Sequence, residues 1–365
     1  MKSWICLFAI TGLTLCARPV AEGLLSYVDP ADGRRKPVRT LQDWEIRRGE
    51  LLDSVQALTG VLPSRSGLPP FDIQYLDSVH ETAYTRYTLR FTVAEGEALP
   101  ALLYVPVSDG ASRRHPAMLA LHPTGASGKQ IVDCERPYAK ELALRGYVVI
   151  APDYPGFGDL SAYDFLNSRY ASGTLKGLFD HIRCVDLLES MECVDADRIG
   201  VIGHSLGGHN ALFAAAFDTR LKAVVTSCGW TDFEYYHIGE EASKRYGGRL
   251  GPWAQDKYMP LLRDVYGLES VPFNFHDLIA LIAPRAVYSF SPLRDDNFDV
   301  EGVRTGIRKA AEVYRFLKAE NQLRVCYPDT VHDFPETCRQ TAYRWTDSLF
   351  SSARAAEKYR MPCGE

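Results

Sequence analysis

The sequence predicts an α/β fold with a mostly parallel central sheet, an antiparallel N-terminal part, helices on both faces and a helical insertion after the sixth strand. In the second half of the chain, short continuous apolar runs alternate with helix-forming stretches. Such runs are typical of parallel strands that are buried on both faces. Before them come segments of alternating polarity, which are typical of antiparallel strands with one solvated face.

Residues 1–21 have the pattern of a secretory signal peptide. Lys2 supplies the positive charge, residues 4–15 are almost wholly apolar, and the small residues Ala17 and Ala21 follow. The apolar run is too short to span a bilayer. We therefore expect cleavage near Ala17 or Ala21, a secreted or periplasmic protein, and no membrane association after cleavage.

Residues 22–43 are polar and turn-rich, and we expect a leader or linker rather than a core element. The main domain is expected over 44–355, beginning with an amphipathic helix at Trp44–Leu58. The segments expected to be antiparallel strands are 71–79, 84–93 and 98–105. Those expected to be buried strands are 117–121, 147–150, 199–201, 223–225, 286–288 and 323–327, and the helical candidates between and after them are 138–145, 175–192, 210–217, 303–317 and 341–355.

The connection at 230–284 is long and rich in aromatic residues. A connection of this length is often a lid over an active site. We expect it to overhang the ends of the strands, with Trp230 and Trp253 lining a substrate pocket. The alternative is an ordinary helical excursion that packs its own small core.

Composition excludes several classes of protein. The chain has 365 residues and a formal net charge of −5, so no basic field indicates binding to nucleic acid or to an anionic membrane surface. Seven of the nine cysteines remain after signal cleavage, too few for a disulfide scaffold of this length. Cys326 and Cys338 could bridge a loop, but two ordinary thiols are favoured. No spacing indicates a zinc site, and no signal sets an oligomeric state.

The most informative motif is Gly203-His204-Ser205-Leu206-Gly207. It follows the apolar run that ends at Ile202 and precedes an alanine-rich helical stretch. A G-x-S-x-G between a strand and a helix is typical of a nucleophile elbow, which presents the serine hydroxyl above the sheet. The alternative is a glycine-rich turn whose serine only caps the helix.

A serine nucleophile needs a general base and an acid that orients the base, and in this topology they follow the serine in the order acid, histidine. Four histidines follow Ser205, namely His209, His237, His276 and His332. Only His332 lies after the last expected strand, so we assign it as the base. Asp295 is the favoured acid, Asp296 is second and Asp299 third. The alternative interpretation of this acidic loop is a polar turn that caps the next helix.

The oxyanion formed during acyl transfer needs backbone donors. Leu206 N–H is the first, because it directly follows the nucleophile. The second is expected from Thr124, or less favourably from Gly125, since Pro123 has no amide hydrogen. His122 is expected to hold this loop. The set requires no metal and no organic cofactor.

These residues resemble the α/β-hydrolase superfamily, in particular its dienelactone-hydrolase-like and acetyl-xylan-esterase-like bacterial members. The resemblance rests on the elbow, the loop LHPTG at 121–125, the stretch PLRDDNF at 292–298 and HDFP at 332–335. It covers roughly residues 44–350. Dienelactone hydrolases proper use a cysteine nucleophile, whereas this chain has Ser205, so lactone hydrolysis by a thiolate is not implied.

The resemblance implies an α/β-hydrolase fold and a serine hydrolase that cleaves a carboxylic ester. The substrate would be a small-molecule or carbohydrate ester, such as an acetyl ester of an extracellular carbohydrate. Two alternatives remain: a serine peptidase of the same fold, and a non-catalytic binding protein that keeps the fold. The complete catalytic set in the expected order argues against the second.

Overall fold

The computed structural model describes residues 23–107, 114–268 and 271–358, and the expected signal peptide lies outside them. The strands of the main sheet are β3 (Gln74–His80), β4 (Tyr84–Ala94), β5 (Glu97–Pro106), β6 (His115–Leu121), β7 (Val148–Pro152), β8 (Val194–His204), β9 (Leu221–Ser227), β10 (Ala286–Phe290) and β11 (Leu323–Cys326). The helices are α1 (Leu41–Thr59), α2 (Tyr138–Leu144), α3 (Gly173–Ser190), α4 (Leu206–Phe217), α5 (Glu240–Arg245), α6 (Leu261–Asp264), α7 (Phe275–Ile282), α8 (Val300–Phe316) and α9 (Glu336–Lys358). Short 3-10 helices are η1 (Gly128–Val132), η2 (Gly158–Leu160), η3 (Phe233–Tyr235), η4 (Gly251–Ala254) and η5 (Glu320–Gln322).

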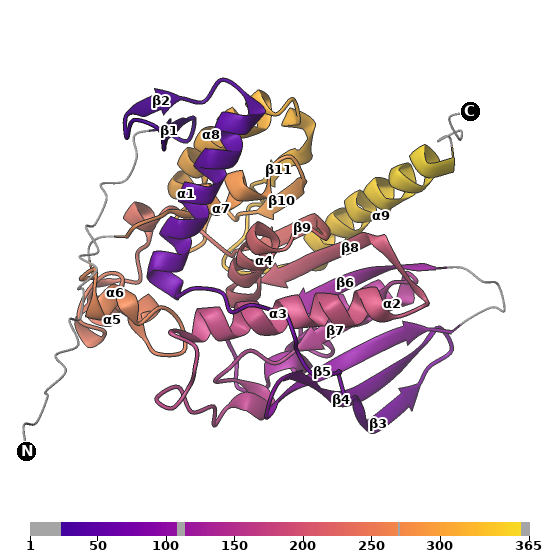
Figure 1. The fold of residues 1–365 in the computed structure, drawn as a ribbon. Coiled ribbons are helices and arrows are strands. Elements are labelled where there is room, and N and C mark those ends of the chain that lie inside the picture. The colour runs from indigo at the N-terminus through magenta and orange to yellow at the C-terminus, as the bar shows by residue number, and fades with distance from the viewer. Residues whose placement is uncertain (1–22, 108–113, 269–270, 359–365) are drawn as a thin grey trace, which may run out of the picture.

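One twisted sheet organises the molecule (Figure 1). Its strand order is β11-β10-β9-β8-β6-β7-β5-β4-β3. The strands from β11 to β7 run parallel, while β5, β4 and β3 form an antiparallel extension. The predicted sheet, mostly parallel with an antiparallel beginning, is confirmed.

Helices cover both faces of the sheet, and this explains the apolar runs. Along β7, Ile150 belongs to the hydrophobic cluster that also holds residues of α1, α3, α4, α7 and α8, whereas its neighbour Val149 belongs to a second cluster with residues of α2 and α9. Successive strand residues point to opposite faces, so a strand covered on both sides must be apolar throughout. Among the described residues, no helix combines the length and apolar character needed to cross a bilayer.

The segment before α1 is part of the core, which corrects the expectation of a leader. Strands β1 (Ser26–Val28) and β2 (Arg35–Pro37) form a small antiparallel hairpin. Tyr27 and Val38 are buried, and the Val28 amide donates to Glu50 Oε1 of α1 at 2.7 Å. The turn that joins the two strands is polar, so the composition of this segment does not reveal these few apolar contacts.

The first helix begins and ends at recognisable caps. Thr40 Oγ1 accepts from the Asp43 amide at 3.1 Å, and Asp43 Oδ2 accepts from the Thr40 amide at 2.8 Å. This capping box satisfies amides that have no partner within the helix. Gly60 ends α1 with φ of 99°, a conformation that favours glycine. Elsewhere in the fold, Cys326 and Cys338 are free thiols, so the loop between them is not bridged.

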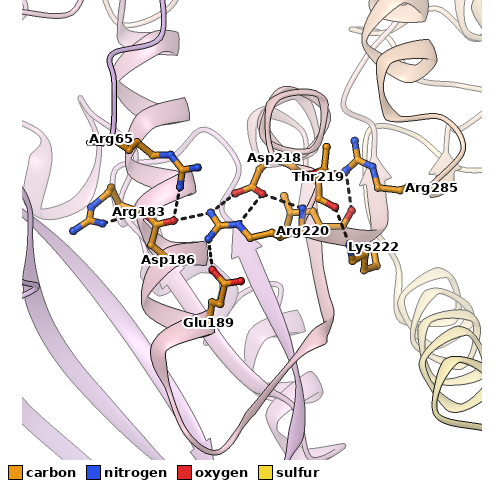
Figure 2. A network of polar contacts seen from close by, with 10 residues as sticks. Arg65, Arg183, Asp186, Glu189, Asp218, Thr219, Arg220, Lys222 and Arg285 are labelled. Atoms are coloured by element: carbon orange, nitrogen blue, oxygen red, sulfur yellow. Dashed lines mark hydrogen bonds and ion pairs between the residues drawn. The ribbon is translucent and has the colours of Figure 1, made fainter. Parts of the chain in front are cut away.

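A polar network joins the C-terminal end of α4 to its surroundings (Figure 2). Arg220 pairs with Asp186, Glu189 and Asp218. On the other side, the Arg285 guanidinium donates to the carbonyls of Ala215, Asp218 and Leu221 at 2.6–3.0 Å. Burial lowers the pKa of Arg285 to about 10, so it remains charged at neutral pH. A cation that binds the last carbonyls of a helix stabilises that end.

We expect Arg285→Ala to lower the free energy of unfolding by about 3 kcal/mol, because buried carbonyls lose charge-assisted hydrogen bonds. Urea denaturation measures this change. Lys222→Ala is the matched control: Lys222 is a neighbouring cation with one exposed contact, to the Thr219 carbonyl, and its loss should cost less than about 0.5 kcal/mol. Equal effects of the two substitutions would contradict the importance of the buried network.

Candidate active site

The strand-turn-helix at Ser205 forms a sharp elbow. β8 ends at His204, α4 begins at Leu206, and Ser205 between them has φ of 53° and ψ of −120°. The flanking glycines are required by space. A Cβ on Gly203 would lie 2.2 Å from the backbone of Gly207, and one on Gly207 would lie 2.0 Å from the Leu121 carbonyl oxygen. A non-glycine residue at positive φ stores strain, and such strain clusters at functional positions.

Three side chains from separate segments form one chain of hydrogen bonds. His332 Nε2 lies 2.9 Å from Ser205 Oγ, and His332 Nδ1 lies 3.0 Å from each oxygen of Asp295. A carboxylate only accepts, so Nδ1 carries the proton and donates to Asp295. The other ring nitrogen then accepts from the serine hydroxyl. This is the arrangement that allows an imidazole to remove a proton from serine.

The acidic residues of the loop after β10 differ in burial and in hydrogen-bond partners. The Asp295 side chain is 1% exposed, and its Oδ1 also accepts from the amides of Asn297 and Phe298 at 2.9 and 3.0 Å. Asp296 is exposed, and Asp299 accepts from the Glu301 amide at the start of α8. Of the three candidate carboxylates in this loop, only Asp295 contacts His332.

The His332 imidazole lies between two rings. The ring centroid of His204 is 5.2 Å away, and that of Phe298 is 5.8 Å away. His204 is buried, and desolvation holds its pKa well below the usual range. The neighbouring imidazole is therefore neutral and adds no positive charge beside His332.

A cavity of about 300 Å³ opens at the nucleophile. Its lining residues are Pro123, Thr124, Gly125, Ala126, Ser127, Ile131, Glu135, Arg136, His204, Ser205 and His332. Thr124 and Gly125, the two expected sources of the second oxyanion donor, both border this cavity. The Leu206 amide is the first in α4 and has no acceptor within the helix, so it is available to a ligand at the elbow.

His122 holds the loop that carries Thr124. Its Nδ1 donates to the Pro123 carbonyl at 2.7 Å, and its Nε2 accepts from the Tyr154 amide at 3.0 Å. Burial lowers its pKa, which keeps the ring neutral as these two bonds require. The expected structural part of His122 agrees with these contacts.

A buried ion pair anchors the same loop, and the sequence reasoning missed it. Lys129 Nζ lies 2.5 Å from Asp153 Oδ2, and both side chains are almost fully buried. Asp153 also accepts from the amides of Lys129 and Asp159 at 2.8 and 3.0 Å. Gly128 and Gly158 pack against this carboxylate so closely that a Cβ would lie 2.2 and 2.1 Å from Asp153 Oδ1. Asp153 therefore links the two turns at Gly128 and Gly158, next to the loop that borders the cavity.

The two tryptophans are buried and do not border the cavity at Ser205. Trp230 is 1% exposed, and its Nε1 donates to Ser289 Oγ at 3.0 Å. Gly306 packs against the Trp230 ring so closely that a Cβ there would lie 2.6 Å from it. The expectation that Trp230 lines a pocket is wrong, because α8 covers its ring.

Trp253 is also buried, within an aromatic cluster. It stacks on His209 at 4.5 Å, and its ring centroid is 6.3 Å from that of Phe298, which in turn contacts His332. Like Trp230, it is absent from the cavity lining. The residues of 230–284 that pack here belong to the core on the α4 face of the sheet, and not to a separate small core. The expectation that Trp253 lines the pocket is therefore also wrong, since its buried ring packs in the core beside Phe298 and does not border the cavity at Ser205.

The other histidines that follow Ser205 lie outside the hydrogen-bonded chain. His276 Nδ1 contacts both oxygens of the buried Asp232 at 2.8–2.9 Å, and together they link η3 to α7. His209 is fully buried, and neither ring nitrogen has a partner in the described part of the chain. His237 borders a surface hollow beside α5.

Buried histidines should make the fold sensitive to acid. Desolvation lowers the pKa of His181 and of His209 to about 3, whereas the value in an unfolded chain is about 6.5. Between these values the unfolded state binds protons that the folded state excludes, so the free energy of unfolding falls as the pH drops from about 6.5 towards 3. Each histidine contributes up to about 1.4 kcal/mol per pH unit. Urea unfolding at several pH values measures the slope.

The variant His209→Phe keeps a ring against Trp253 and removes one titrating group, so it should reduce this slope. His237→Phe, which alters an exposed histidine, is the control and should leave the slope unchanged. An identical slope in the wild type and in His209→Phe would contradict the interpretation.

One group of potential metal ligands occurs among the described residues. Cys228 Sγ, an Asp295 oxygen and a His332 nitrogen lie within 4.8 Å of one another. His332 Nδ1 and Asp295 are already joined by a hydrogen bond, which an ion would have to displace.

Comparisons with known proteins agree with the fold. A model of the prolyl oligopeptidase family matches residues 137–276. The structure is similar to a glucuronoyl esterase from Solibacter usitatus, with a TM-score of 0.68 and 20% identity over 90% of this chain and 98% of that one. The chain has the fold of the α/β hydrolases.

This α/β hydrolase also has relatives along most of its length. It is 27% identical to the Bacillus subtilis protein named "Putative hydrolase YtaP" over 82% of this chain and 98% of that protein. An acetyl xylan esterase from Paenibacillus sp. R4 superimposes with a TM-score of 0.54 and 20% identity, over 81% of this chain and 99% of that one. The predicted superfamily and the predicted class of enzyme, a serine hydrolase, are confirmed.

Proposed function

We propose that this α/β hydrolase is a secreted or periplasmic esterase that cleaves carboxylic esters of carbohydrates through a covalent acyl-enzyme. The observation that carries the proposal is the continuous hydrogen-bonded chain from Asp295 through His332 to Ser205. The expected signal peptide at 1–21, with cleavage near Ala17 or Ala21, supports the location.

In the first half-reaction, Ser205 Oγ attacks the ester carbonyl while His332 Nε2 takes its proton. Asp295 stabilises the imidazolium and keeps Nδ1 as the donor. The amides of Leu206 and Thr124 bind the oxyanion of the tetrahedral intermediate. His332 then gives the proton to the leaving alcohol, and the acyl group remains on Ser205.

In the second half-reaction, His332 removes a proton from water, which attacks the acyl-enzyme. Collapse of the second tetrahedral intermediate returns the proton to Ser205 and releases the carboxylic acid. The base acts twice in the same position, so the chain needs no further proton carrier. Each step is carried by groups that this chain supplies.

The lining of the cavity supports a polar substrate. Most of its residues are polar or small, and Ile131 is the largest aliphatic one. A long acyl chain would desolvate these polar groups without replacing their hydrogen bonds, whereas a sugar would replace them. Two of the solved structures that share this fold are, by name, a glucuronoyl esterase and an acetyl xylan esterase.

The test is hydrolysis of nitrophenyl acetate under burst conditions, followed by a panel of acetylated sugars and short peptides. An esterase releases nitrophenol in a burst equal to the enzyme concentration when deacylation is slow. Cleavage of peptides without cleavage of sugar esters would instead favour a peptidase, the activity in the name of the matching family model. Absence of turnover on all three classes would favour a non-catalytic binding protein.

A further inference from the structure

One wall of the cavity carries two adjacent side chains of opposite charge. Glu135 and Arg136 lie between η1 and α2 and border the same 300 Å³ cavity as Ser205 and His332. The Glu135 side chain is exposed, and its carboxylate has no partner among the residues that the structure describes. Neither residue belongs to a motif that predicts a part in the site.

Arg136 is oriented by one contact and keeps other donors open. Its Nε donates to Asp333 Oδ1 at 3.3 Å, and its Nη2 lies 3.2 Å from the same oxygen. A guanidinium has five N–H donors in a rigid plane. The remaining three have no partner within the described ranges, and the side chain is 31% exposed. The guanidinium is therefore fixed at the edge of the cavity with donors to spare.

The loop after β6 supplies hydroxyl groups to the same cavity. Thr124 and Ser127 border the cavity from the loop after β6, and both are exposed. An alcohol or acyl group bound in this cavity meets a planar cation, a carboxylate and two hydroxyls. Neighbouring hydroxyls of a pyranose match this set, because each hydroxyl both donates and accepts.

We propose that Arg136 and Glu135 form a specificity-determining subsite for the sugar part of the ester. Arg136 donates to hydroxyl oxygens on the ring that carries the ester, and Glu135 accepts from a hydroxyl of the same ring. A neutral sugar fits better than an anionic one, since Glu135 and Asp333 place two carboxylates against the single guanidinium. The inference rests on the proposed esterase function and names the residues that select its substrate.

The test compares an acetylated methyl xyloside with nitrophenyl acetate, which has no sugar hydroxyls. In Arg136→Gln and in Glu135→Gln, we expect kcat/KM for the xyloside to fall at least about tenfold more than kcat/KM for nitrophenyl acetate. The change should lie mainly in KM, because the lost bonds hold the ground state and the transition state alike. Melting temperatures identify any loss of folding.

Two control variants separate binding from other effects. Asp333→Asn keeps Arg136 but removes its ion pair beside His332. If this ion pair acts through the position of the base, the variant should lower kcat/KM equally for the xyloside and for nitrophenyl acetate. Lys140→Gln makes the same change of charge as Arg136→Gln, but at an exposed position of α2 outside the cavity. It should leave the ratio of kcat/KM for the two substrates unchanged.

Three outcomes would overturn the subsite: an equal loss on both substrates in Arg136→Gln and Glu135→Gln, the same ratio change in Lys140→Gln, or no change of ratio in any variant. Each of these leaves the esterase itself intact. Failure of the wild type to hydrolyse either ester would instead overturn the proposed function, so the two failures are distinguishable.

Discussion

Replacing Ser205 with alanine is expected to lower kcat for ester hydrolysis by about a millionfold, leaving only the rate that the oxyanion donors provide. The substitution removes the atom that would form the acyl-enzyme, 2.9 Å from His332 Nε2. Alanine fits the elbow in size, although φ of 53° remains unfavourable for it as it is for serine. Steady-state hydrolysis of nitrophenyl acetate measures the loss.

Labelling by a fluorophosphonate gives a second measurement that does not depend on turnover. The wild type should react at Ser205 and the variant should not. The melting temperature of Ser205→Ala should stay close to that of the wild type, which excludes unfolding as the cause. A variant that folds normally and retains full hydrolysis would refute the proposed nucleophile.

Replacing Asp295 with asparagine should lower kcat by about 10²- to 10⁴-fold. The neutral amide can offer an N–H to His332 Nδ1, which then favours the tautomer with its proton on Nε2. In that tautomer the ring cannot accept the proton of Ser205. Buried Asp295 also stabilises the imidazolium that forms during attack, and asparagine does not.

The neighbouring Asp296→Asn is a matched control, because it makes the same chemical change one residue away on an exposed side chain. It should lower kcat less than about tenfold. Reversed effects of the two variants would move the orienting acid to Asp296. Equal and small effects would indicate that no carboxylate in this loop orients the base.

The sequence predicted those parts of the molecule that depend on local pattern or on topology. Strand β8, the elbow and α4 are continuous in the chain, so glycine spacing and apolar periodicity suffice to find them. Asp295 and His332 are distant from Ser205 in sequence, but parallel strands bring the loops at their carboxyl ends to one edge. Their order along the chain was enough to predict that they meet.

The features that were missed depend on packing between segments. Gly306 of α8 has no side chain, so this helix can lie against the ring of Trp230. The sequence around Trp230 contains no sign of this contact. The pair of Lys129 and Asp153 joins residues that are separated by a strand and a helix, and neither residue belongs to a recognisable motif. Tyr27 and Val38 are two of the few apolar residues in a polar segment, so the sequence shows no hydrophobic periodicity that would predict their burial against α1.

Asp153 anchors the loop after β6, and this anchoring bears on the range of acyl groups that the proposed esterase can accept. Because a buried carboxylate holds both glycine turns, the loop does not need to rearrange when an anion develops beside it, and no reorganisation free energy is added to the barrier. The same rigidity means that the loop cannot retreat from an acyl group that collides with it. For the proposed esterase, we therefore expect the folded loop to set the range of acyl groups, and not induced fit during each encounter.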